Sequence, residues 1–176
     1  MSLQRIVCLA VLASAAAASA AEPAETGKPR VREMVADRRY ALFPMWNCGP
    51  GELRHKVTLS VDGVPKRIMD LLLPQKDPDW WASMDVSAYR GKTLRFEMAD
   101  VPAGEYDQLQ RIELSDDPRL PPGLHDEAYR PQLKFTADRG WINDPNGLVY
   151  QNGKWRLFYQ HNPYSVWWGN LHWGYA

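Results

Sequence analysis

The dipeptide Asn152-Gly153 constrains the fold of this chain more than any other feature. It lies between two short runs, residues 147–150 and 154–160, that are rich in apolar, strand-forming residues. Asn-Gly in such a setting is among the strongest signals for a two-residue turn between antiparallel strands. The sequence therefore predicts a β-hairpin over these residues.

The first half of the chain carries a second turn of this kind at Asp62-Gly63. Strands are predicted on both sides of it, and Pro65 places the second of them at a sheet edge or at a strand start. The predicted strands cover residues 56–61, 64–73, 85–89, 93–98 and 109–114. Because no segment has a convincing helical period, we expect an all-β fold with a small β-sandwich over residues 38–115.

Two clusters rich in proline then interrupt the chain and predict a linker over residues 116–130, followed by a second β segment over residues 131–176. Residues 21–37 contain few apolar side chains, and a flexible leader is predicted there. Residues 1–20 have the pattern of a secretory signal peptide, with an apolar stretch shorter than the ~20 residues of a membrane-spanning helix. We expect cleavage near Ala20 and a secreted or periplasmic protein without a membrane anchor; the alternative is a buried N-terminal helix.

Charge and cysteine content exclude several classes of partner. The 21 Lys and Arg residues balance the 21 Asp and Glu residues, which argues against a nucleic-acid partner. Cys48 is the one cysteine after the signal, so no internal disulfide is expected, and a buried thiol is favoured over a nucleophile. No spacing is typical of a metal site, and we expect neither a metal nor another cofactor.

A turn does not explain the carboxylate of Asp144 within the stretch WINDPNG, residues 141–147. Pro145 disfavours the helical region at the residue before it, so Asp144 is expected to be extended, at the end of a strand. Residues 145–147 are then expected to turn the chain into the hairpin. Two interpretations remain open from the residues: a carboxylate aimed at a substrate, or one that caps the turn by accepting backbone N–H groups.

Side chains near Asp144 suit a sugar. The amides of Asn143 and Gln160 can donate to and accept from hydroxyl groups. Half of the 20 aromatic residues fall in the last 36 positions, and four of the five tryptophans there are candidates for stacking on a sugar through their flat apolar faces: Trp141, Trp167, Trp168 and Trp173. Core packing is the alternative for these tryptophans, and a structural role is the alternative for His161 and His172.

Three ordered motifs, WINDPNGLVY at 141–150, LFYQHNPY at 157–164 and WGNLHWG at 168–174, resemble the opening of glycoside hydrolase family 32. This family comprises invertases, inulinases and levanases, which cleave β-fructofuranosyl bonds. Residues 38–115 are similar, more loosely, to the β-rich N-terminal extension of some bacterial levanase-like enzymes. The family fold is a five-bladed β-propeller, of which residues 131–176 would supply the first blade.

The resemblance implies a role for individual residues. Asp144 matches the catalytic nucleophile of a retaining hydrolase, in which two carboxyl groups stand about 5–5.5 Å apart. The positions that match the fructose subsite are Trp141, Ile142, Asn143, Gln160 and Trp168. The resemblance assigns no chemistry to His161, Asn162, Asn170 and His172, and Tyr175 departs from the histidine that many members have there.

The partner carboxyl groups of the family lie in Glu-Cys and Arg-Asp-Pro motifs, and the sequence contains neither. We therefore expect a truncated catalytic domain that binds a fructan or sucrose substrate but is inactive alone. Alternatives are a non-catalytic carbohydrate-binding protein, an N-terminal domain that only packs against the propeller, and a related furanosidase of the five-bladed propeller clan.

A single propeller blade leaves uncovered the apolar faces that its neighbours would bury. We therefore predict that limited proteolysis cleaves residues 131–176 before it cleaves residues 38–115. Equal protection of the two segments would contradict this expectation.

Overall fold

The computed structural model describes residues 29–47, 54–74, 76–99 and 108–176. The predicted signal peptide, Cys48 and residues 21–28 of the predicted leader lie outside the described residues. Regular structure in the described segments consists of strands and two short 3-10 helices, Ser87–Tyr89 and Gln108–Arg111, which confirms the all-β class. None of the described helices is long and apolar enough to cross a membrane.

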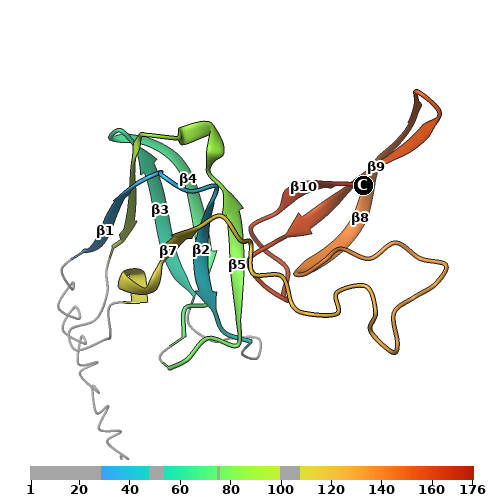
Figure 1. Ribbon diagram of the computed structural model, residues 1–176, viewed down its shortest axis with the longest axis horizontal. Helices are drawn as coiled ribbons and strands as arrows, with labels where there is room; N and C mark the ends of the chain where they lie inside the picture. The colour runs from blue at the N-terminus through green and yellow to red at the C-terminus, as the bar shows by residue number, and fades with distance from the viewer. Residues whose placement is uncertain (1–28, 48–53, 75, 100–107) are drawn as a thin grey trace, which may run out of the picture.

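Residues 30–115 form two antiparallel sheets, called here the N-terminal sheets. The order is β1-β6-β3-β4 in the four-stranded sheet and β5-β2-β7 in the three-stranded sheet (Figure 1). The strands are β1 (Arg30–Val35), β2 (Tyr40–Met45), β3 (His55–Val61), β4 (Val64–Leu71), β5 (Trp80–Asp85), β6 (Thr93–Met98) and β7 (Glu113–Ser115).

One apolar core lies between the N-terminal sheets. In β3, alternate residues point into it, and Val57, Leu59 and Val61 are buried. Phe43 of β2 meets Phe96 of β6 edge to face, with ring centroids 5.5 Å apart and an interplanar angle of 84°. Burial of such side chains is the main favourable contribution to folding, because it removes apolar area from water.

Several predicted elements are confirmed. Asp62 and Gly63 both have positive φ, 47° and 78°, as the two-residue turn between β3 and β4 requires. Strand β4 is an edge strand, which agrees with Pro65 near its start. Strand β6 covers the predicted residues 93–98.

The predicted leader, residues 21–37, is wrong over its last part, because residues 30–35 form β1. This strand pairs with β6, where Arg95 bonds to Glu33 at 2.8 Å and also to Glu97. The charged side chains that indicated a flexible segment thus belong to a paired strand, in which Glu33 is exposed while Arg30 and Arg32 are half-buried. Pairing with a distant strand outweighed local composition.

Two predicted strands are misplaced. The one at residues 85–89 is wrong, because the strand ends at Asp85, whose carboxylate accepts the Ser87 N–H at 2.9 Å and starts a 3-10 turn. The one at residues 109–114 is also wrong, because residues 108–111 are a 3-10 helix and only residues 113–115 pair with β2.

Strands β8 (Trp141–Gln151), β9 (Lys154–Asn162) and β10 (His172–Tyr175) form the C-terminal sheet, with β9 in the middle. Asn152 and Gly153 have φ values of 53° and 76°, which confirms the predicted hairpin turn. Figure 1 shows the hairpin tip projecting away from the N-terminal sheets. The irregular segment before β8 runs to residue 140, ten residues beyond the predicted linker.

The N-terminal sheets and the C-terminal sheet share one core residue. Tyr164, which follows β9, is only 2% exposed and belongs to the core cluster of the N-terminal sheets. Its ring meets Phe43 edge to face at 5.9 Å. The start of the β9–β10 connection is therefore held by the N-terminal sheets, although the hairpin tip is not.

Replacement of Phe43 tests this shared core. We expect Phe43→Ala to lower the free energy of unfolding by about 3–5 kcal/mol, because it removes a buried ring that contacts both Phe96 and Tyr164. Urea unfolding measures the change. Phe135→Ala is the matched control, since Phe135 is 44% exposed; an equal loss in both variants would contradict the shared core.

Candidate active site

Two extra residues in β8 shape the backbone around Asp144. Ile142 pairs with His161 and Gly147 pairs with Phe158, so five steps along β8 are set against three along β9. Pro145 lies within this stretch and has no N–H to donate to the ladder. Strand β8 therefore bulges between Ile142 and Gly147, and bulges of this kind redirect side chains.

The bulge corrects one expectation. Residues 145–147 do not turn the chain into the hairpin, and Asp144 is not at a strand end. The chain continues in β8 to Gln151, and the turn comes at residues 152–153. Pro145 and Gly147 lie between two runs of strand-forming residues, so they resembled a turn. An irregularity inside a single strand accommodates them equally well.

Asp144 and Asn143 together occupy the place opposite a single β9 residue, Gln160. Asp144 is exposed. Within the described part of the chain its carboxylate has no hydrogen-bond or ion-pair partner, so the turn-capping interpretation gains no support there. The carboxylate oxygens are accessible to a molecule that approaches this side of the sheet.

A chain of side-chain hydrogen bonds runs beside Asp144. The Trp141 indole Nε1–H donates to Asn143 Oδ1 at 3.0 Å, and the Asn143 amide in turn donates to Gln160 Oε1. Because both amide oxygens are used as acceptors, the Gln160 NH₂ group remains to donate outward. The structure therefore brings together three of the predicted residues and orients their amides.

The other two predicted subsite residues are placed differently. Ile142 pairs with His161, so its side chain points to the opposite face of the sheet from its neighbours Trp141 and Asn143. Trp168 belongs to the connection between β9 and β10, and its side chain is 63% exposed. Trp173, a candidate from the sequence that the resemblance does not assign to the subsite, pairs with Gln160 and is 74% exposed.

Both histidines of the motifs have structural contacts. His161 Nε2 lies 2.9 Å from the carbonyl oxygen of Arg139. His172 hydrogen-bonds through Nδ1 to the Asn170 carbonyl and packs edge to face on Tyr164 at 5.7 Å. Burial, followed by the charge of Arg67, lowers the pKa of His172 below its ordinary value.

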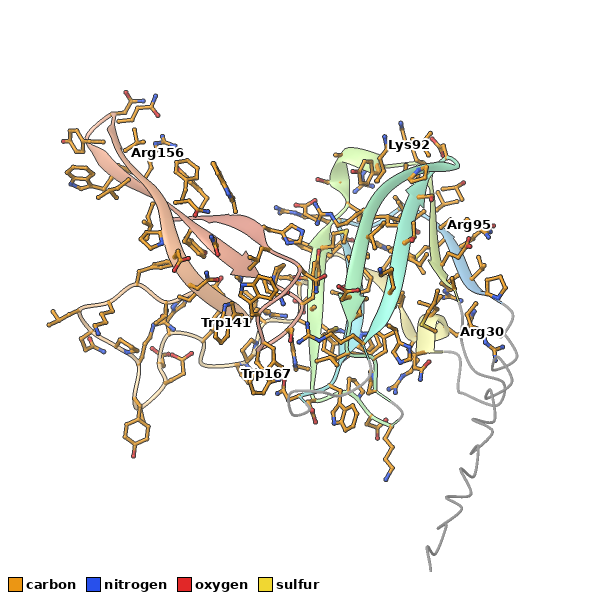
Figure 2. All side chains as sticks on the ribbon, turned by 180° about the vertical axis from the view of Figure 1, so that it is seen from behind. Arg30, Lys92, Arg95, Trp141, Arg156 and Trp167 are labelled. Atoms are coloured by element: carbon orange, nitrogen blue, oxygen red, sulfur yellow. The ribbon has the colours of Figure 1, made fainter. Side chains whose placement is uncertain are left out.

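Sequence reasoning assigned no role to the residues that order loop 163–171, the connection between β9 and β10. Asn162 is completely buried; its Oδ1 accepts the Tyr164 N–H at 3.0 Å and its Nδ2 donates to the Trp167 carbonyl at 2.8 Å. Membership of the motifs was the signal that could have found this asparagine. Figure 2 shows Trp141 and Trp167 near the N-terminal sheets, with Arg156 toward the far end of the hairpin.

Two cavities lie outside this constellation. A cavity of about 560 Å³ is lined by the segment before β8 and by Tyr159 and His161, on the sheet face opposite Gln160. A cavity of about 430 Å³ lies beside Trp80 and Trp81. Asp144 lines neither. The described residues contain no group of three or more His, Cys, Asp or Glu side chains placed to hold a metal ion.

The comparisons with known proteins concern the segment that holds this constellation. Residues 134–176 match the family model described as the glycosyl hydrolases family 32 N-terminal domain. Over 52 residues the chain is 56% identical to a levanase of Bacillus subtilis (strain 168) and 50% identical to an extracellular exo-inulinase of Aspergillus awamori. Over 57 residues it is 43% identical to an invertase of Schizosaccharomyces pombe.

These matches are to glycoside hydrolases. Residues 134–176 are similar to the N-terminal domain of glycoside hydrolase family 32, in agreement with the resemblance of the three motifs. The matched residues are 30% of this chain but only 8% of the levanase and 10% of the exo-inulinase, so the chain spans about a tenth of the length of these relatives.

A solved structure of a glycoside hydrolase from family 32 of Bifidobacterium adolescentis also aligns with the chain. It covers 83% of this chain and 25% of that chain, with 21% sequence identity and a TM-score of 0.32. A TM-score this low does not establish a common fold.

The position of His172 predicts a pH effect on stability. Its lowered pKa means that the folded chain resists protonation, while the unfolded chain takes up a proton as the pH falls through about 6.5. The free energy of unfolding should therefore fall between pH 7.5 and pH 5, and His172→Gln should reduce this fall. Urea unfolding at several pH values measures both; an unchanged pH dependence in the variant would contradict the assignment.

Proposed function

We propose that the protein containing this chain hydrolyses β-fructofuranosyl bonds in fructans or sucrose, with retention of configuration and with Asp144 as the nucleophile. The observation that carries the proposal is the bulge in β8, which sets an accessible carboxylate beside the ordered amides of Asn143 and Gln160. The similarity of this segment to a levanase, an exo-inulinase and an invertase supports fructosyl substrates.

In the proposed reaction, an oxygen of Asp144 bonds to the anomeric C2 of the fructosyl unit as the bond from C2 to the leaving oxygen breaks. A carboxylic acid protonates that oxygen, and water, deprotonated by the same group, then releases fructose from Asp144. Since the sequence contains neither the Glu-Cys nor the Arg-Asp-Pro motif that carries the partner carboxyl groups of the family, we propose that the acid comes from a part of the enzyme outside these 176 residues.

The fructose subsite in this proposal uses the same sheet face. The Gln160 NH₂ group and the Asn143 amide would bind sugar hydroxyls, and their hydrogen bond holds them ready in one orientation. Trp141 and Trp168 would supply apolar walls, and Ile142, whose side chain points to the opposite face, would contribute through its backbone. Preorganised amides cost less entropy on binding than freely rotating ones.

The C-terminal sheet is proposed to be the first blade of a five-bladed propeller. The N-terminal sheets are proposed to be a β-sandwich that begins at residue 30 and not at the predicted residue 38. Large apolar side chains exposed on the blade support this, because neighbouring blades would cover them. They are Leu148, Val149, Tyr150, Trp155, Trp173 and Tyr175. The extracellular relative and the signal-like first 20 residues support a secreted protein.

We expect the 176-residue chain to release no fructose from levan, inulin or sucrose, because one carboxylate alone cannot both attack and protonate. Reducing-sugar assay and chromatography of the products measure this. Fructose release that Asp144→Asn abolishes would overturn the expectation and would point to a second carboxyl group within the chain.

In a protein that continues this chain through a whole family domain, Asp144→Asn should lower kcat by at least about a thousandfold, since it removes the group that forms the covalent intermediate. Asn146→Ala, an exposed change in the same bulge, is the control and should retain most activity. Nuclear magnetic resonance of the first-formed fructose anomer tests retention. Equal effects of the two substitutions would contradict a nucleophilic role for Asp144.

A carbohydrate-binding role for the N-terminal sheets is the second candidate, favoured by the cavity beside Trp80 and Trp81. Existing contacts already occupy part of these rings: the Arg119 guanidinium lies 4.5 Å from the Trp81 ring centre, and Trp80 Nε1 donates to Asn47 at 2.9 Å. We therefore favour a packing role for the N-terminal sheets. Titration calorimetry of the chain with levan oligosaccharides distinguishes packing from carbohydrate binding. Heat that disappears in Trp80→Ala but not in Asp144→Asn would favour binding.

A further inference from the structure

The edge of the four-stranded N-terminal sheet is closed by a side chain from loop 163–171. Strand β4 is at this edge, so its outward backbone groups have no neighbouring strand. Asn170 bonds to both outward groups of Asp70: its Oδ1 accepts the Asp70 N–H and its Nδ2 donates to the Asp70 carbonyl, each at 2.7 Å. The asparagine amide thus pairs with β4 as a peptide group of another strand would.

A second contact anchors the start of the same loop. Tyr164 is buried against Phe43, and its hydroxyl oxygen accepts a hydrogen bond from Arg67 of β4 at 3.2 Å. Burial raises the pKa of the Tyr164 hydroxyl, so the side chain stays neutral at physiological pH. Two residues of β4 therefore hold loop 163–171, one near each end.

Trp168 lies between these two anchors. Its carbonyl oxygen accepts a hydrogen bond from Arg54 at 3.2 Å, while its side chain is 63% exposed. Because packing restrains this indole little, the region that the ring can reach is set by where the backbone places the Trp168 Cα. The backbone of Trp168 is held directly by Arg54, the residue just before β3. On either side of it, Tyr164 and Asn170 are held by the N-terminal sheets.

We propose that the N-terminal sheets are a positioning element for Trp168, with Asn170 and Tyr164 as the positioning residues. The link from Trp168 to a fructose subsite depends on the proposed function; the clamp on loop 163–171 does not. The N-terminal sheets thereby influence the site without contact with the sugar. The contact between Asp70 and Asn170 could not be predicted from the sequence, because about 100 residues separate them.

Asn170→Gly tests the clamp with little backbone strain, because Asn170 has a φ of 40°, a conformation that glycine adopts freely. The matched control is Asn152→Gly, at an asparagine of φ 53° in the hairpin turn. Hydrogen exchange followed by mass spectrometry should show exchange at Asp70 and in loop 163–171 accelerated about tenfold or more in Asn170→Gly. Unchanged exchange there, or equal acceleration in Asn152→Gly, would overturn the clamp.

The position of Trp168 needs its own readout. In chain labelled with 5-fluorotryptophan, the fluorine resonance missing from Trp168→Phe identifies this residue. We expect that resonance to shift and narrow in Asn170→Gly as the indole gains mobility, while the Trp80 resonance, identified in the same way, stays in place. A Trp168 resonance that does not change although loop exchange accelerates would overturn the positioning role.

Tyr164→Phe provides a second variant should Asn170→Gly fail to fold. It keeps the buried ring and removes only the oxygen that accepts from Arg67, so the core remains filled. The same direction of change in the Trp168 resonance is expected, and its absence would count against the proposal. Because none of these measurements uses a sugar, their outcome is separate from the Asp144 test of the proposed function.

Discussion

Burial of Tyr164 is the interaction on which the arrangement of this molecule depends. One ring fills the core between the N-terminal sheets and packs on both Phe43 and His172, so the two halves of the chain cannot separate without opening that core. The hydroxyl keeps a partner in Arg67, which avoids the cost of an unsatisfied buried polar group. The C-terminal sheet is thereby attached at one end and free at its hairpin tip.

A second constraint acts within β8. Pro145 cannot donate to the ladder, and two extra residues must leave the regular register. The strand meets both requirements in one irregular stretch, with a register shift on each side of Pro145, and the first shift moves Asp144 out of the pairing pattern. The stiffness of the Asp-Pro backbone and the hydrogen bonds from Trp141 to Asn143 and on to Gln160 then give the bulge a defined shape.

Local features were predictable wherever the reason for them is local. The turns at residues 62–63 and 152–153 need positive φ at both positions, which Asp, Asn and Gly tolerate, so these hairpins can be read from a few residues. Strand β1 could not be found in this way. Its charged composition indicates a flexible leader, and only pairing with β6, 58 to 68 positions away, makes it a strand.

By itself, the sequence determined the all-β class, the two hairpins and the resemblance of the C-terminal segment to glycoside hydrolase family 32, because turn chemistry and motif order are properties of neighbouring residues. It also identified Asn143, Asp144 and Gln160 as a group. Only the tertiary structure decided that Ile142 points away from that group and that Asn170 and Tyr164 bind to β4. Strand register and burial set these placements, and both arise from contacts between residues far apart in the chain.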